Sequence, residues 1–289
     1  MVAKRARRRV LGLSAMSVGA VTLLAGCNVG DAFGGFGWPK GGITEQSERM
    51  YDLWVGSVVA ALAVGVFVWG LIFWCIAAYR RKRGDVDLPT QTRFNLPIEI
   101  LYTVLPFLVI SVLFYYTAII QTDVDRLSKN PDATVEVVAF KWNWQFNYLA
   151  SPEPDAERVE STPGDSNYIP IVVVPVGQTV RFVEHSADVI HSFWVPELLF
   201  KRDVFPGNVV NQFEVTVTQP GAYVGRCAEL CGTYHSMMNF ELRAVTPEKY
   251  QQFVAALKAG KNTPQALTAI GEPAFATKTV PFPTLRTAN

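Results

Sequence analysis

Charged residues, histidines and cysteines are all scarce in this sequence. Asp, Glu, Lys and Arg make up 18% of the 289 residues, whereas a typical soluble domain carries about 25%; this disfavours a wholly soluble protein. The hydrophobic content of 49% is too high for a disordered chain. The 26 basic and 25 acidic residues nearly cancel, so the basic excess of a nucleic-acid-binding protein is missing. No nucleic-acid partner is therefore expected.

The first residues have the pattern of an export signal. A basic run from Lys4 to Arg9 precedes an apolar stretch, Val10 to Leu24, that is too short to span a bilayer comfortably. Leu24-Ala-Gly-Cys27 then resembles the lipobox of bacterial lipoproteins. That resemblance implies a cleaved signal peptide at 1–26, a lipid on Cys27 and an outer linker at 27–50. The alternative is an uncleaved signal-anchor helix in which Cys27 is incidental.

Two long uncharged runs predict a pair of transmembrane helices. Leu53 to Tyr79 contains 27 residues and Ile100 to Thr122 contains 23, and about 20 apolar residues suffice to cross the hydrocarbon core. We expect helices at 51–79 and 97–122. The loop at 80–96 is rich in Arg and Lys and should face the cytoplasm, because positive charge is retained there. Both ends of the mature chain then lie on the extracytoplasmic side of a bacterial cell membrane.

The rest of the chain predicts an outer β domain at 123–246. Apolar and polar residues alternate at Phe213–Thr218, as expected for a half-buried strand, and Pro-Gly turns separate several short strand-like runs. These features indicate a β-sandwich or barrel, with a surface insertion near 150–167. A helix at 247–261 and an extended tail complete the prediction for 247–289. Six strands are expected, at Thr134–Phe140, Tyr168–Val174, Thr179–Val183, Asn211–Thr218, Ala222–Arg226 and Asn239–Val245.

Cysteine, histidine and methionine cluster in one segment of the outer domain. Cys227 and Cys231 are followed by His235 and Met238, and His191 lies upstream. Thiolate, imidazole and thioether are ligands that favour copper. Two thiolates suit two bridged copper ions, each with one histidine and one weak ligand, either Met238 or a backbone carbonyl. A disulfide and a zinc site remain alternatives, although zinc does not account for Met238.

These motifs resemble the CuA domain of cytochrome c oxidase subunit II, over most of the chain from Tyr51 to Val245. The matching segments are Asp188-Val-Ile-His191-Ser-Phe, Val195-Pro-Glu, Lys201-Arg-Asp203-Val-Phe-Pro206-Gly207 and Cys227–Met238. The resemblance implies a membrane α+β fold, in which a two-helix hairpin precedes a cupredoxin-like β-sandwich. The copper ligands it implies are His191, Cys227, Cys231, His235, Met238 and the backbone carbonyl of Glu229. The Glu229 side chain would reach a Mg²⁺ or Mn²⁺ ion shared with subunit I.

Two further residues gain a role from the same resemblance. Trp142, in Lys141-Trp-Asn-Trp-Gln-Phe-Asn147, matches the tryptophan over which the donor haem docks. Glu99, at the cytoplasmic end of the second span, matches the glutamate at the mouth of a proton-uptake path. From position alone, the favoured interpretation of Trp142 is core and interface filling, and that of Glu99 is a carboxylate stabilised by the helix dipole. Asn143, Asn147 and Asn208 depart from the common Tyr, Glu and Arg.

The resemblance implies the electron-accepting subunit of a proton-translocating respiratory oxidase. A c-type cytochrome would reduce the copper centre, and electrons would pass to haem in subunit I, where oxygen is reduced to water. Subunits I and III are the expected partners, and the haems lie only in partner subunits. The loss of an acid at Asn147 and the insertion favour a tethered donor, the haem c domain of a cytochrome bc complex in a supercomplex. The alternatives are a copper-free quinol-oxidase-type subunit II and another membrane-anchored copper electron-transfer protein.

Overall fold

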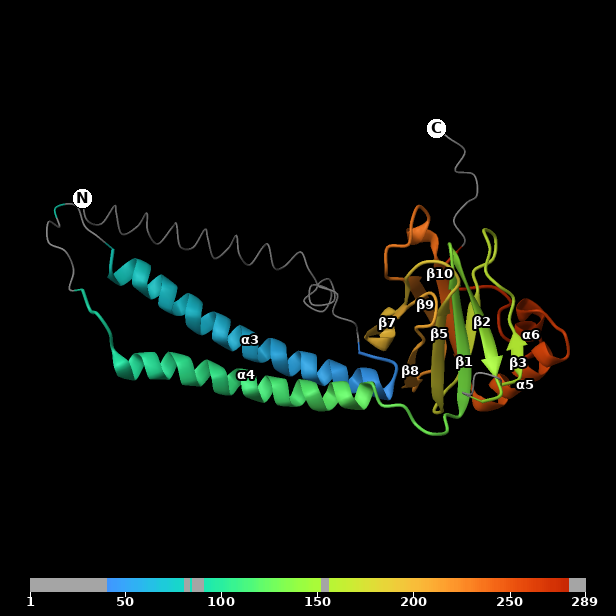
Figure 1. Cartoon of the computed structure of the whole chain (residues 1–289), viewed down its shortest axis with the longest axis horizontal. Helices are drawn as coiled ribbons and strands as arrows, with labels where there is room; N and C mark the ends of the chain where they lie inside the picture. Colours follow the sequence, from blue (N-terminus) through green and yellow to red (C-terminus); the bar gives the residue numbers. More distant parts are fainter. Residues whose placement is uncertain (1–40, 81–83, 85–90, 152–155, 281–289) are drawn as a thin grey trace, which may run out of the picture. The chain divides into compact units, whose positions relative to one another are not determined.

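The computed structural model describes residues 41–80, 84, 91–151 and 156–280. The predicted signal peptide, Cys27 and part of the charged loop at 80–96 lie outside the described residues. The first two described helices are α3 (Glu45–Ala78) and α4 (Leu96–Val124), drawn in Figure 1 as two long helices. Each is long and apolar enough to cross a membrane. Their large apolar side chains are exposed, including Phe67 and Phe114, as expected for helices whose surroundings are lipid.

Local hydrogen bonds fix where these helices begin. Thr44 and Ser47 form a reciprocal capping box at the start of α3, with N–O distances of 2.9 and 3.0 Å. The Asn95 side chain accepts a hydrogen bond from the Ile98 amide at the start of α4. Both caps satisfy amide groups that the first helical turn leaves without partners.

The residues before α3 belong to the outer domain. The Ile43 amide donates to the Glu197 carbonyl at 3.1 Å, and the Thr218 amide donates to the Ile43 carbonyl at 2.8 Å. The Ile43 side chain lies in the domain core. An ion pair of 2.7 Å joins Arg49 in α3 to Asp123 in α4. The start of α3 and the end of α4 therefore meet on the side of the β domain, which makes the two helices an antiparallel hairpin.

The outer domain contains two five-stranded sheets. One has the order β3-β2-β1-β5-β8 and the other the order β4-β10-β9-β6-β7. Neighbouring strands are antiparallel except for the parallel pairs β1·β5 and β10·β4. The strands of the first sheet are β1 (Ala133–Phe140), β2 (Asn143–Leu149), β3 (Arg158–Glu160), β5 (Thr179–Ser186) and β8 (Asn211–Thr216). The strands of the second are β4 (Ile171–Pro175), β6 (His191–Val195), β7 (Phe200–Val204), β9 (Gly221–Cys227) and β10 (Asn239–Val245).

Aromatic side chains between the sheets form the core. Phe182 of β5 lies 5.2 Å from Phe193 of β6, measured between ring centroids, and Trp144 of β2 lies 5.3 Å from Phe240 of β10. All four residues are at most 1% exposed, and burying each contributes roughly 1.5–3 kcal/mol. Strands β6, β9 and β10 carry or flank the Cys/His/Met cluster. This packing therefore holds the residues of the cluster in fixed positions.

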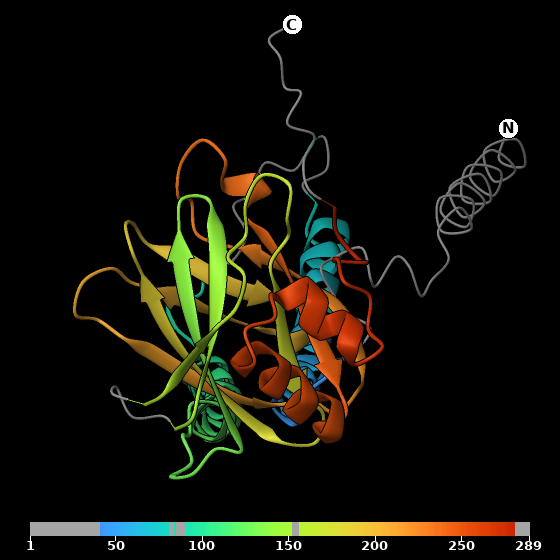
Figure 2. The ribbon, with the colours of Figure 1, turned by 90° about the vertical axis from the view of Figure 1, so that its right-hand side faces the viewer.

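Two short helices follow the sandwich and correct one expectation. α5 (Pro247–Lys258) lies where a helix was expected, but the following segment is not wholly extended, because it contains α6 (Thr263–Ala269). Figure 2 shows both helices against the sheets. Asn262 and Gln265 form a capping box that starts α6. Thr263 is buried and exchanges two hydrogen bonds with Thr162, of 2.9 and 3.0 Å. Tertiary contact therefore stabilises a helix too short to be stable alone.

Four strands were not among the six expected, and the first is β2, which carries most of the aromatic segment that follows Trp142. β3 lies inside the surface insertion, and it pairs with β2 from Asn147↔Glu160 to Leu149↔Arg158. The other two are β6 and β7, on either side of the short 3₁₀ helix η1 (Pro196–Leu198). Four of the five residues of β6 are buried. A strand buried on both faces shows no polar alternation, which is why the pattern did not reveal it.

Candidate metal centre

The Cys/His/Met cluster comes together at one end of the second sheet. His191 begins β6, Cys227 ends β9, and Met238 directly precedes β10. Phe193 of β6 pairs with Cys227 of β9, which places the histidine and the first cysteine on adjacent strands. The loop between β9 and β10 then supplies Cys231 and His235, the latter from the 3₁₀ helix η2 (His235–Met237).

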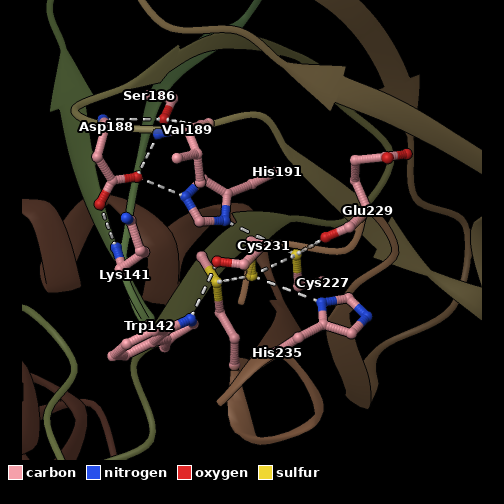
Figure 3. A network of polar contacts seen from close by, with 11 residues as sticks. Lys141, Trp142, Ser186, Asp188, Val189, His191, Cys227, Glu229, Cys231 and His235 are labelled. Carbon is pink, nitrogen blue, oxygen red and sulfur yellow. Dashed lines mark hydrogen bonds and ion pairs between the residues drawn. The ribbon is translucent and has the colours of Figure 1, made fainter. Parts of the chain in front are cut away.

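The two cysteine sulfurs occupy the middle of the cluster. Their separation is 3.8 Å, far beyond the roughly 2.05 Å of a disulfide bond, so both thiols are free. The His191 Nδ1 atom lies 3.8 Å from the Cys227 sulfur, and the His235 Nδ1 atom lies 3.5 Å from the Cys231 sulfur. Figure 3 shows the two imidazoles on opposite sides of the sulfur pair. Each thiol thus has one histidine beside it.

Two weaker donors complete the cluster. The Met238 sulfur lies 3.8 Å from the Cys231 sulfur, and the Glu229 carbonyl oxygen lies 3.3 Å from the Cys227 sulfur. The Glu229 side chain extends away from the cysteines (Figure 3). The structure therefore brings together all six groups that the sequence predicted as copper ligands.

Because the cluster is buried, negative charge on its cysteine thiolates is unfavourable unless a cation is bound. Cys227, Cys231, His191 and Met238 are all at most 8% exposed. Burial, reinforced by the neighbouring Cys227, raises the pKa of the Cys231 thiol to about 12. This thiol is protonated at neutral pH unless a metal ion is bound, and metal binding displaces its proton. Thiol, imidazole and thioether donors are compatible with a soft or borderline metal cation.

Asp188 orients the His191 ring through its Nε2 atom, while the other ring nitrogen, Nδ1, lies beside Cys227. The Asp188 Oδ1 atom lies 2.8 Å from the His191 Nε2 atom, while Oδ2 accepts a hydrogen bond from the Lys141 amide at 2.7 Å (Figure 3). Partial burial raises the pKa of Asp188, but the hydrogen bonds from His191, Lys141 and Val189 outweigh it and hold that pKa below its usual value. An ionised carboxylate at Nε2 leaves Nδ1 free to bind a metal. Sequence reasoning missed this role, although the spacing Asp188-x-x-His191 is its signal.

Both tryptophans of the predicted aromatic segment contact the loop between β9 and β10 that carries the candidate metal ligands. The Trp142 indole donates to the Cys231 carbonyl at 3.2 Å, and the Trp144 indole donates to the Met238 carbonyl at 3.3 Å. Trp144 is fully buried, whereas Trp142 is partly exposed. Gly232 has a φ of +122°, and a Cβ atom there would lie 3.2 Å from the Trp142 ring. Trp142 is therefore the aromatic side chain that links the surface to a cysteine of the cluster.

The other predicted site residues lie elsewhere. Glu99 is in the first turn of α4, and its side chain accepts a hydrogen bond from the Asn95 amide at 3.0 Å. This contact gives Glu99 a capping role that does not depend on any proton path. His185, the remaining histidine, lies on β5 outside the cluster.

Comparisons with known proteins identify the family. Residues 133–245 match the model described as "Cytochrome C oxidase subunit II, periplasmic domain". A protein named "Probable cytochrome c oxidase subunit 2" from Nocardia farcinica is 41% identical, over 96% of this chain and 88% of the relative. The chain belongs to the cytochrome c oxidase subunit II family. A Streptomyces avermitilis relative with the same name is 43% identical, over 88% of each chain.

Membership of this family defines the coarse assignment. The chain is a subunit of cytochrome c oxidase and therefore associates with other subunits of that oxidase. The expected fold class is confirmed: two apolar helices precede the β domain. The His/Cys/Cys group, whose donor atoms lie within 4.8 Å of one another, is compatible with a CuA site. One similar solved structure is described as the periplasmic domain of subunit II of cytochrome oxidase from Bradyrhizobium japonicum. Its sequence is 26% identical, the match covers 46% of this chain and 99% of that chain, and the TM-score is 0.38.

Proposed function

We propose that this chain is the electron-accepting subunit of the oxidase, which takes electrons from a c-type cytochrome through two copper ions and passes them to haem in subunit I. The observation that carries the proposal is the symmetry of the donor set. Two sulfurs 3.8 Å apart have one imidazole and one weak donor on each side. A single tetrahedral zinc ion would need both imidazoles on one centre, and it would leave Met238 without a role.

The protein's contribution is to hold this donor set in place. Bound copper would supply one-electron chemistry. Cys227, Cys231, His191, His235 and Met238 would hold the two ions, and Asp188 holds His191 in the orientation that presents Nδ1. The Trp144 indole and the Cys227 amide both donate to the Met238 carbonyl, which fixes the loop that carries the thioether. Burial excludes water, and a rigid set of ligands limits the rearrangement that accompanies each change of charge.

Trp142 is the proposed point of electron input. It is partly exposed and hydrogen-bonded to the carbonyl of Cys231, so it connects the surface to a proposed copper ligand through one contact. The Glu229 side chain is half-buried and points away from the cysteines (Figure 3). We propose that it reaches a Mg²⁺ or Mn²⁺ ion shared with subunit I, because hard oxygen ligands suit these ions. The chemistry of oxygen takes place in subunit I.

The order of reduction tests this function. Mixing the assembled oxidase with a reduced c-type cytochrome in a stopped-flow instrument should bleach the near-infrared absorbance of copper before haem absorbance changes. Reduction of haem while the copper centre is still oxidised would reject the proposal. A complete lack of near-infrared copper absorbance would favour the alternative of a copper-free, quinol-oxidase-type subunit.

The surface beside the aromatic segment bears on the identity of the donor. Asn147 is buried and donates to Glu136 at 2.7 Å, so an acidic group is present there after all, on the neighbouring strand. Arg158 of β3 pairs with the same carboxylate at 2.9 Å. The insertion that carries Arg158 therefore neutralises this acid. We propose on this basis that the donor is the haem c domain of a cytochrome bc complex in a supercomplex, since such a donor needs no acidic docking surface.

Replacing Arg158 tests this electrostatic argument. Arg158→Ala should raise the turnover driven by a soluble, basic cytochrome c at low ionic strength by a few-fold, because a charge at the rim of an interface acts mainly on the association rate. The gain should vanish in high salt. Lys258→Ala, which removes a cation paired with Glu157 at 3.3 Å, is the matched control. Strong, salt-suppressed activity of the unmodified oxidase with soluble cytochrome c would contradict the tethered donor.

Glu99 and the membrane topology complete the proposal. We place α3 and α4 across a bacterial cell membrane with the β domain outside, anchored in addition by a lipid on Cys27. Glu99, partly exposed at the start of α4, would then lie at the cytoplasmic surface, at the mouth of a proton-uptake path into subunit I.

A conservative substitution of Glu99 separates its two roles. Glu99→Gln keeps a side-chain oxygen that can accept from the Asn95 amide, but it cannot bind and release a proton. Turnover should fall about tenfold, the effect of raising a barrier by roughly 1.4 kcal/mol, with copper loading unchanged. Steady-state oxygen consumption and a copper assay measure both quantities. Full turnover by this variant would limit Glu99 to its capping role.

A further inference from the structure

A second aromatic residue packs against Trp142 at the surface. The ring centroids of Trp142 and Tyr234 are 4.9 Å apart, and the ring planes meet at 86°. This is an edge-to-face contact, in which the positive edge of one ring meets the negative face of the other. Tyr234 is 45% exposed and directly precedes His235 in the chain. A residue beside a proposed copper ligand thus holds the proposed electron-input residue.

Besides its packing against the core, Trp142 makes two contacts with the backbone of the same loop. The indole nitrogen donates to the Cys231 carbonyl, and the ring passes close to Gly232, whose missing side chain makes the approach possible. These two contacts fix the edge of the indole that faces the cluster. Rotation of the ring plane is opposed by Tyr234, whose ring stands almost perpendicular to it.

We propose that Tyr234 is a positioning residue that sets the plane of Trp142 for electron transfer from the donor. The proposal rests on the electron-input role of Trp142 given above. The contact is between rings, so the ring and not the hydroxyl of Tyr234 carries the effect. Tyr234→Phe should therefore behave as the unmodified protein, whereas Tyr234→Leu keeps an apolar side chain but removes the edge-to-face contact.

The test compares two reductants on the assembled oxidase. Reduction of copper by a soluble, reduced c-type cytochrome is followed by stopped flow, alongside reduction by hexaammineruthenium(II), a small ion that needs no docking surface. Tyr234→Leu should slow the cytochrome reaction about three- to tenfold, the scale of one aromatic pair, and leave the ruthenium reaction unchanged. The copper spectrum should stay unchanged in both variants; Tyr234→Met replaces the leucine variant if the loop is disturbed. Ser236→Ala, on the other side of His235 and also exposed, is the control for a general effect on the loop.

A double-mutant cycle decides between positioning and direct docking. If Tyr234 acts through Trp142, adding Tyr234→Leu to Trp142→Phe should cause little further loss. Equal losses in both backgrounds would show that Tyr234 touches the donor by itself and would overturn the inference. A normal rate of copper reduction in Tyr234→Leu, when Trp142→Phe alone is slow, would also overturn the inference. A normal rate for Trp142→Phe would overturn the electron-input role itself, and the inference with it.

Discussion

Cys227→Ser should abolish the copper centre and, with it, all oxygen consumption driven by a cytochrome donor. The Cys227 sulfur lies within 3.8 Å of the Cys231 sulfur and the His191 nitrogen, and 3.3 Å from the Glu229 carbonyl. A serine hydroxyl stays protonated at neutral pH and is a hard oxygen ligand, so it cannot replace a thiolate that bridges two soft ions. Copper per chain, measured by elemental analysis, should fall from two to one or none.

Cys75→Ser is the matched control for this substitution. Cys75 lies in α3 and is exposed there, and it is the third free cysteine of the described residues. The same chemical change at that position should leave the copper content and the visible spectrum unaltered. A Cys227→Ser oxidase that retained two copper ions per chain would contradict the proposed bridging role.

Trp142→Phe should have the second largest effect, and it should act on electron transfer without affecting copper. Phenylalanine keeps an aromatic ring but loses the indole nitrogen that donates to the Cys231 carbonyl. Without this bond the ring is free to shift, and small misplacements of reacting groups can cost up to about a hundredfold in rate. The rate of copper reduction by a c-type cytochrome should fall on that scale, while the copper spectrum and content remain normal.

Trp144 shows why this result would be specific to Trp142. Both indoles donate to carbonyls of the metal-binding loop, but Trp144 is fully buried against Phe193 and Phe240. Trp144→Phe should therefore weaken copper retention or stability, because it removes a core contact and the partner of the Met238 carbonyl. Partial loss of copper in Trp142→Phe, with a normal reduction rate in the chains that retain copper, would reverse the two roles and contradict the account.

The sequence predicted which residues would come together as the candidate site better than it predicted the contacts that position them. The spacing of Cys227, Cys231, His235 and Met238 is local, so it was visible in one segment. Asp188 lies only three residues before His191, so that contact was also local but was overlooked. The contact between Tyr234 and Trp142 joins segments that meet only in the folded domain, so no local pattern could reveal it. Apolar length alone predicted both long helices.

The fold shows the same division between local and tertiary signals. The alternation of apolar and polar residues made β8 visible in the sequence. Strand β6 shows no such alternation, because its residues are buried on both faces. Helix α6 was missed because seven residues are too few to form a stable helix without the contact between Thr162 and Thr263.

The state of copper in the oxidised protein tests the central claim most directly. Elemental analysis combined with electron paramagnetic resonance should find two copper ions in each chain and one unpaired electron shared equally between them. The hyperfine pattern should then be that of two equivalent copper nuclei. A single copper ion with its own unpaired electron, a bound zinc ion or a chain without copper would contradict the account.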